Sequence, residues 1–341
     1  MRNLGVREGD VVVMDDPTYF LVADIVRACG ASIRLVPMLP DGPDVNALER
    51  VLSEADARVR ALYIVGPCYH NPTGAVTSPE KARMLIGLAE KHEFFVVADE
   101  PYALMGFGDA ARRGSTSIKI HESLVSFVGD RPSASRPSSR VISLGSFSKI
   151  LAPGLRLGWL HACPALVSEV FGRDPALGSG GGVNPFVAHL VHKALFAPDA
   201  SEMSARLTAL NDAAAKKARA LSAAIVTHFG DAVEFVRPEG GYFLWCRFTG
   251  KTPGVADGKP TRFDTDASDF RKWLLQPHNK EAYRVCFLHG DRCKACDEGD
   301  RRRFRGHFRC SWAFYDEFEL VEGVRRLRCA WEKYVSEKMS L

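Results

Sequence analysis

Six short apolar runs lie within the first 165 residues, and helix-length segments separate most of them. The runs are apolar almost without interruption, which is typical of strands covered on both faces of a sheet. Segments at residues 20–29, 45–52 and 79–92 have the length and periodicity of helices. Because strands alternate with crossover helices, the pattern predicts an α/β fold with a doubly wound, mostly parallel sheet. The predicted strands are residues 10–14, 33–37, 61–65, 94–98, 141–144 and 157–162.

The pattern changes near residue 197. An Ala-rich segment with interspersed Lys and Arg at residues 201–228 predicts one extended helix. We therefore predict a large domain at residues 1–196 and a smaller α+β domain at residues 197–341. Stretches 106–140 and 249–265 are rich in turn-forming residues, which favours insertions. In the second domain we expect strands at residues 233–237, 242–247, 284–288 and 307–311, and helices at 267–274 and from residue 315.

Composition narrows the class of protein. The 341 residues are 46% hydrophobic and 25% charged, as in ordinary globular proteins. A net charge of +4 gives no basic field that would favour nucleic acid, and no apolar run reaches the roughly 18 residues of a membrane helix. The nine cysteines form no disulfide framework, so we expect a reducing compartment and a cytoplasmic protein.

The strongest chemical feature is the sequence SFSKILAPGLRLGW at residues 146–159. Lys149 follows an apolar strand, at the edge where the carboxyl ends of parallel strands open onto a ligand crevice. The hydroxyls of Ser146 and Ser148 precede it, and Arg156 follows it. An amine among hydroxyls and a guanidinium suits a cofactor that bears an aldehyde and a phosphate. The amine would form a Schiff base, and the other groups would hold the dianion.

Three further strand ends carry candidate residues. Asn71 lies in YHNPTG after strand 61–65, where an Asn-Pro-Thr-Gly turn also has a purely structural explanation. Asp99 ends a buried strand in FFVVADEPY, and Tyr102 follows three residues later. A buried carboxylate needs a partner, and a protonated pyridine nitrogen is one. Tyr19, in MDDPTYF, is placed where an aromatic side chain stacks on a flat ring.

Taken together, these motifs resemble the class I/II pyridoxal-phosphate aminotransferases of fold type I. The matches run in order through GDVVVMDDPTY, YHNPTG, ADEPY, GSFSKILAPGLRLGW, PEGGYFLW and FRCSWAF, and cover essentially the whole chain. The sequence is most similar to the branch of 2-aminoadipate, kynurenine and aromatic-amino-acid transaminases. The resemblance implies pyridoxal 5'-phosphate as cofactor, an amino acid and a 2-oxo acid as substrates, and a homodimer.

The resemblance also implies a role for each candidate residue. Lys149 would be the Schiff-base lysine and proton shuttle, and Asp99 would pair with the pyridinium nitrogen. Asn71 and Tyr102 would hydrogen-bond the ring's phenolic oxygen. The remaining roles implied are phosphate binding by Ser146, Ser148 and Arg156, ring stacking by Tyr19, and bidentate binding of the substrate α-carboxylate by Arg309.

The sequence departs from the family at its beginning. Only eighteen residues precede Tyr19, and the family's Gly-rich turn, whose backbone N–H groups cradle the phosphate, has no counterpart here. We therefore expect an N-terminally truncated chain that binds the cofactor weakly by itself. Two alternatives stay open: another pyridoxal-phosphate reaction at the α-carbon, such as carbon–sulfur lysis, and an inactive remnant of the fold.

Two smaller motifs admit more than one explanation. Cys293 and Cys296 form CKAC, which is a possible zinc motif, although the family has no such site. The segment GSGGGVNPF at residues 178–186 is either a plain loop or, as in the family, a segment of the partner subunit that lines the cofactor pocket.

Overall fold

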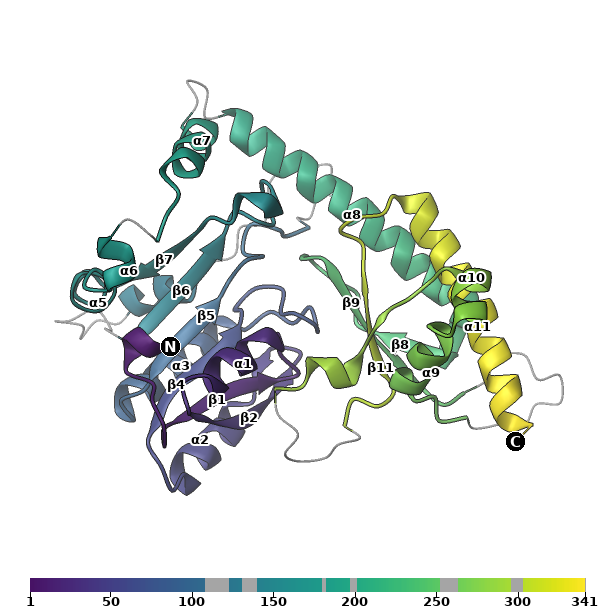
Figure 1. The fold of residues 1–341 in the computed structure, drawn as a ribbon, viewed down its shortest axis with the longest axis horizontal. Coiled ribbons are helices and arrows are strands. Elements are labelled where there is room, and N and C mark those ends of the chain that lie inside the picture. The colour runs from purple at the N-terminus through teal and green to yellow at the C-terminus, as the bar shows by residue number, and fades with distance from the viewer. Residues whose placement is uncertain are drawn as a thin grey trace.

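The computed structural model describes residues 1–107, 123–130, 140–179, 182–196, 201–251, 263–295 and 303–340. Most of the two expected insertions, at residues 106–140 and 249–265, therefore lies outside the described residues. Within these ranges the chain forms two separate sheets, one of seven strands and one of four (Figure 1).

The first sheet has the predicted α/β organisation. Its strand order is β3-β2-β1-β4-β5-β6-β7; the neighbours from β2 to β6 are parallel, and β3 and β7 join antiparallel at the two edges. The fold class is confirmed, and each predicted strand is present within a few residues of its expected bounds. The strands are β1 (Val11–Asp16), β2 (Ser32–Leu39), β3 (Gly42–Pro43), β4 (Val59–Val65), β5 (Phe95–Asp99), β6 (Val141–Ser146) and β7 (Gly158–Ala162).

Helices cover both faces of this sheet, as continuous apolar strands require. The three predicted crossover helices are α1 (Leu21–Arg27), α2 (Val45–Glu54) and α3 (Pro79–Lys91). The side chains of Asp44 and Ser78 cap α2 and α3 by accepting backbone N–H groups, which fixes where each helix begins. Successive residues of β5 enter two different cores, because side chains of a strand alternate between its faces.

The second sheet is antiparallel, in the order β10-β11-β9-β8. Its core packs Phe248 against Phe308 and Trp331, whose ring centroids lie 4.6 and 5.9 Å from that of Phe248. Its elements are α8 (Ser201–Phe229), β8 (Val233–Phe235), β9 (Phe243–Phe248), α9 (Ala267–Leu274), α10 (Pro277–Tyr283), β10 (Leu288–His289), β11 (His307–Ser311) and α11 (Glu317–Met339).

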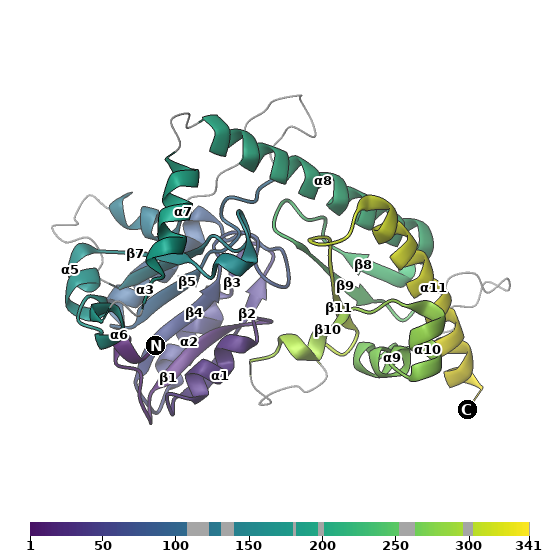
Figure 2. The same ribbon diagram turned by 45° about the horizontal axis from the view of Figure 1, so that its top comes forward.

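The long helix α8 runs from the first sheet to the second in both views (Figures 1 and 2). The Asn211 side chain on α8 donates to the Leu104 carbonyl at 3.0 Å, which ties this helix to the loop after β5. Short helices connect β7 to α8: α5 (Pro164–Leu166), α6 (Pro175–Gly178) and α7 (Pro185–Leu195). The domain boundary at residue 197 stays a prediction, although the two sheets do use strands from either side of it.

One predicted strand is mostly wrong. Residues 284–288 were expected to be extended, but α10 ends at Arg284 with a left-handed φ of 48°. Only Leu288 of that stretch belongs to β10. The run RVCFL has strand-like composition, but residues 284–287 after the helix have no regular structure.

Candidate active site

The predicted site residues gather where β1, β4, β5 and β6 end. Because these neighbouring strands are parallel, their carboxyl ends lie on one edge of the sheet. Tyr19 follows β1, Asn71 follows β4, Asp99 ends β5, and Lys149 lies in the turn after β6. β11 of the second sheet supplies Arg309 to the same place.

Asp99 is held from one side only. Its Oδ2 accepts the Tyr63 hydroxyl at 2.7 Å, whereas Oδ1 takes no hydrogen bond from the described part of the chain. Burial raises the pKa of Asp99, the Asp15 charge raises it further, and the Tyr63 bond and the Lys149 charge oppose the rise. A carboxylate in this position favours a cationic partner at its free oxygen.

Lys149 is half-buried, and its ammonium faces other cations. Burial lowers its pKa most, followed by the charges of Arg156 and Arg309, while Asp99 acts in the opposite direction. The Tyr242 hydroxyl donates to the Lys149 carbonyl at 3.0 Å and anchors its backbone. A lowered pKa makes the neutral amine, which is the nucleophile and base, more accessible near neutral pH.

Ser146, Ser148 and Arg156 form a cluster of hydrogen-bond donors beside Lys149. Arg156 Nη1 lies 3.4 Å from the Ser148 hydroxyl, and the Ser148 N–H donates to the Ser146 hydroxyl at 3.2 Å. Arg156 has no carboxylate partner among the residues described. Gly145 precedes this cluster, and the Trp159 ring lies so close over it that a Cβ there would fall 1.9 Å from a ring atom.

Asn71 and Arg309 are joined directly. Arg309 Nη1 donates to the Asn71 Oδ1 at 2.6 Å, which leaves the Asn71 amide nitrogen free to donate elsewhere. The Arg309 guanidinium also lies over the Phe243 ring, 4.0 Å from its centroid. Burial lowers the pKa of Arg309, and no carboxylate of the described residues pairs with it. A half-buried guanidinium without a counter-ion is suited to an anionic ligand.

Two aromatic residues complete the predicted set. Tyr102 is buried edge-on against Phe243 at 5.9 Å, and burial raises the pKa of its hydroxyl, so the hydroxyl stays a proton donor at neutral pH. Tyr19 lies close enough to Tyr102 and Arg309 to affect them electrostatically. The structure therefore brings every predicted site residue into one region, while the roles assigned to them stay predictions.

Asp15 and His70 form a buried pair next to the site that we did not predict from the sequence. Asp15 is fully buried, and its Oδ2 accepts the Val65 N–H at 2.8 Å and His70 Nε2 at 3.0 Å. The Thr73 N–H donates to His70 Nδ1, so the ring proton lies on Nε2 and points at Asp15. The two adjacent aspartates in MDDPTY and the histidine before NPTG were the available signals, because a histidine needs a partner when buried.

The smaller motifs have plain structural positions. Asn184 caps α7 by accepting the Phe186 and Val187 N–H groups. Cys293 is buried, Cys296 lies outside the described residues, and no group of three or more metal-binding side chains occurs within the ranges given above. Nor does any helix there have the length and apolar character needed to cross a membrane.

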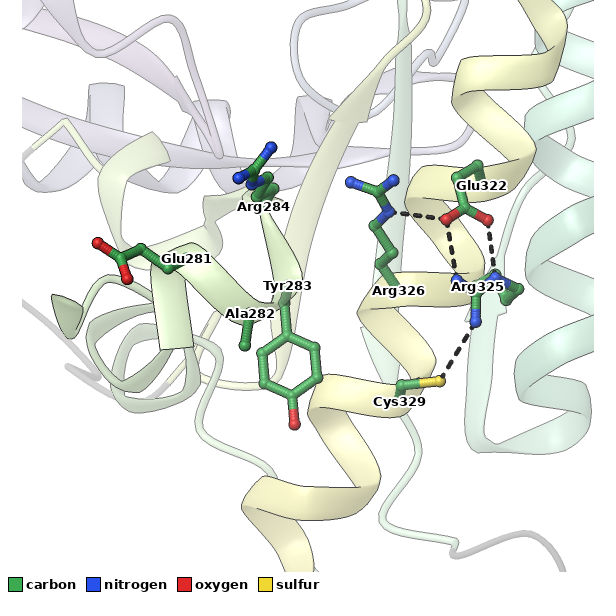
Figure 3. A pocket seen from close by; sticks show the side chains of 8 residues that line it. All are labelled: Glu281, Ala282, Tyr283, Arg284, Glu322, Arg325, Arg326 and Cys329. Carbon is green, nitrogen blue, oxygen red and sulfur yellow. Dashed lines mark hydrogen bonds and ion pairs between the residues drawn. The ribbon is translucent and has the colours of Figure 1, made fainter. Parts of the chain in front are cut away.

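A cavity of about 510 Å³ lies between α10 and α11 (Figure 3). Glu322 in its wall accepts hydrogen bonds from Arg325 and Arg326, which lower the pKa of Glu322 to about 2. Two of its three arginines therefore share one carboxylate partner, and none of its lining residues belongs to the predicted set. The region around Lys149 is the better candidate for chemistry.

The comparisons with known proteins point to one family. The model of "Aminotransferase class I and II" matches residues 2–290. This chain belongs to the class I and II aminotransferases. The 2-aminoadipate transaminase of Thermus thermophilus is 30% identical over 94% of this chain and 69% of that protein. Aromatic-amino-acid aminotransferase 1 of Thermococcus litoralis is 24% identical over 94% of this chain and 67% of its own length.

Solved structures agree. The α-aminoadipate aminotransferase LysN of Thermus thermophilus, complexed with N-(5'-phosphopyridoxyl)-L-leucine, has a TM-score of 0.77 and 27% identity, and the match covers 98% of this chain and 75% of that one. The predicted family, enzyme class and cofactor are confirmed. This aminotransferase is a pyridoxal-phosphate enzyme whose substrates are an amino acid and a 2-oxo acid.

Proposed function

We propose that Lys149 is the attachment point of pyridoxal phosphate in this aminotransferase and the group that moves the substrate's α-proton. The observation that carries this proposal is the placement of Lys149 in the turn after β6, where the charges of Arg156, Arg309 and Asp99 all act on its amine. Pyridoxal phosphate supplies a conjugated ring that accepts electrons from the α-carbon. The chain must supply the proton transfers and hold both ends of the cofactor.

The residues present fit the two ends of the cofactor. The free Oδ1 of Asp99 can accept a hydrogen bond from a protonated ring nitrogen, and the uncompensated Arg156 with two serine hydroxyls suits a phosphate. Asn71 has a free amide nitrogen and Tyr102 a buried hydroxyl donor, which suits an anionic phenolic oxygen. Tyr19 is the aromatic side chain available for stacking on the ring.

Arg309 would bind the α-carboxylate of the amino acid. Its planar guanidinium matches the two oxygens of a carboxylate. The hydrogen bond to Asn71 and the contact with the Phe243 ring fix the plane of this guanidinium. Because Arg309 and Lys149 are close enough to repel each other, a carboxylate between them would relieve an existing electrostatic cost.

Borohydride reduction of the holoenzyme, followed by peptide mapping, tests the assignment of Lys149. We expect the reduced cofactor to be attached to Lys149, and Lys149→Ala to remove both the attachment and the turnover. The nearby Lys294→Ala, which removes an amine paired with Asp291, is the matched control and should keep both. A label on another lysine would contradict the proposal.

The subunit organisation and compartment also remain proposals. Large apolar side chains along α6 and α7 are exposed, with Phe186 71% and Phe196 70% accessible, and a second subunit of a homodimer would cover them. Light scattering tests this, since Phe186→Glu should then give monomers. The eight cysteines in the described ranges all have free thiols, which supports a reducing, cytoplasmic environment.

A further inference from the structure

Tyr63 lies directly behind the proposed cofactor partner Asp99. It belongs to β4, which runs between β1 and β5 in the centre of the first sheet. Tyr63 is opposite Val97 of β5, and Asp99 is two residues further along, on the same face of the sheet. A tyrosine ring is long enough to cross this diagonal, and the hydroxyl reaches Asp99 Oδ2 at 2.7 Å.

The direction of this hydrogen bond is fixed by chemistry. Tyr63 is 2% exposed, and burial together with the Asp99 charge raises its pKa well above the ordinary value, so it keeps its proton at every physiological pH. An ionised carboxylate only accepts, so Tyr63 donates. The bond occupies Oδ2 and leaves Oδ1 as the only carboxylate oxygen of Asp99 without a donor in the described part of the chain.

We propose that Tyr63 is a positioning residue for transamination, which orients Asp99 so that its Oδ1 alone faces the ring nitrogen of pyridoxal phosphate. This inference rests on the proposed role of Asp99. Without this bond, the Asp99 carboxylate would rotate about χ2, whose preferences are broad and roughly two-fold. It would then not hold one oxygen toward the ring nitrogen.

The same bond also favours the ionised form of Asp99. Burial and the Asp15 charge favour the neutral acid, whereas the Tyr63 bond and the Lys149 charge favour the anion. The charges of Asp15 and Tyr19 also raise the pKa of Tyr63, but less than burial and Asp99 do. Removing the hydroxyl would therefore shift the balance toward the neutral acid, which cannot pair with a pyridinium.

Tyr63→Phe tests the proposal, with Tyr334→Phe as the matched control. Tyr334 is also buried, 3% exposed, but lies in the core of the second domain. For Tyr63→Phe we expect about tenfold weaker cofactor retention in equilibrium dialysis of the holoenzyme, as for loss of one hydrogen bond to a charged group. We also expect a similarly lower kcat, an unchanged KM for the amino acid, and an acid limb of the kcat profile at higher pH. Tyr334→Phe should change none of these.

Asp99→Asn tests the proposed role of Asp99 separately from the proposed role of Tyr63. If Asp99→Asn retains cofactor and turnover, the role of Asp99 itself is wrong. If Asp99→Asn is impaired while Tyr63→Phe matches the wild type in cofactor retention and acid limb, Asp99 is correctly assigned and the positioning role of Tyr63 is refuted.

A further variant covers the case in which Tyr63→Phe does not fold. Incorporation of 3-fluorotyrosine at position 63 makes the hydroxyl a stronger donor at nearly constant volume. The acid limb should then move to lower pH. An unchanged limb in this variant would overturn the proposal.

Discussion

Glu100 is a buried carboxyl whose ionisation should destabilise this aminotransferase at neutral pH. It is 6% exposed, and its Oε1 accepts the Leu124 N–H at 2.9 Å and the Ser143 hydroxyl at 2.7 Å. Burial outweighs these bonds and raises the pKa of Glu100 from 4.5 to about 7. The Ser123 side chain also hydrogen-bonds to this carboxyl. Glu100→Gln keeps an acceptor oxygen for Leu124 and Ser143, presents an amide from which the Ser123 hydroxyl can accept, and removes the ability to ionise. The variant therefore isolates the cost of the charge.

The direction and size of the pH effect on stability follow from the linkage between folding and proton binding. For an acid with a raised pKa, the unfolded state loses its proton first, so stability falls as the pH rises from 4.5 through about 7. At about 1.4 kcal/mol for each tenfold difference in proton affinity, the wild type loses about 3 kcal/mol over this interval. Glu100→Gln should match the wild type below pH 4.5 and exceed its free energy of unfolding by about 3 kcal/mol above pH 7.

Denaturant unfolding between pH 4 and 8 measures this difference. The control is Glu49→Gln, which removes an exposed carboxyl from α2 and the same formal charge. We expect a difference curve that rises with pH for Glu100→Gln and stays nearly flat for Glu49→Gln. A flat curve for both variants would show that Glu100 ionises as easily when folded as when unfolded, and would refute the reasoning.

Three further outcomes follow from the same geometry. Arg309→Lys should raise KM for amino acids about tenfold, because an ammonium cannot reproduce the planar fork; equal turnover of an amino acid and its decarboxylated amine would contradict this. Asp99→Ala should lower kcat roughly a hundredfold or more while the protein stays folded, as steady-state kinetics and circular dichroism would show. Asp16, buried beside Arg303 at 3.0 Å, has a pKa raised to about 6, chiefly by burial. Asp16→Asn should therefore add about 3 kcal/mol to the free energy of unfolding above pH 6 and nothing below pH 3.8, measured by denaturant titration.

The first domain was largely predictable because its order is local. Strands that are apolar on both faces need helices on both faces, so alternating strands and helices favour a doubly wound parallel sheet. In such a sheet, the loops that carry the motifs follow the carboxyl ends of the strands. The carbonyl–guanidinium bond between Asn71 and Arg309 could not be predicted in this way, because 238 residues separate its partners and two sheets must come together to form it. The hydrogen bond of the Tyr63 hydroxyl could not be predicted for another reason. An aromatic residue in an apolar strand has the composition of a core residue, and only the register against β5 reveals its polar partner.

The charges at the site explain why it is suited to a ligand with two anionic groups. Lys149, Arg156 and Arg309 have no carboxylate ion-pair partner within the described ranges, and the first is repelled by the other two. Asp99 opposes this effect on Lys149, and burial already favours the neutral form of Asp99. Cations held together at such a cost are stabilised when a phosphate binds at Arg156 and a carboxylate at Arg309. Because each anion relieves part of the same repulsion and the two anions repel each other, the second anion to bind gains less than it would alone. Phosphate and substrate carboxylate should therefore weaken each other's binding slightly, and each should raise the pKa of Lys149.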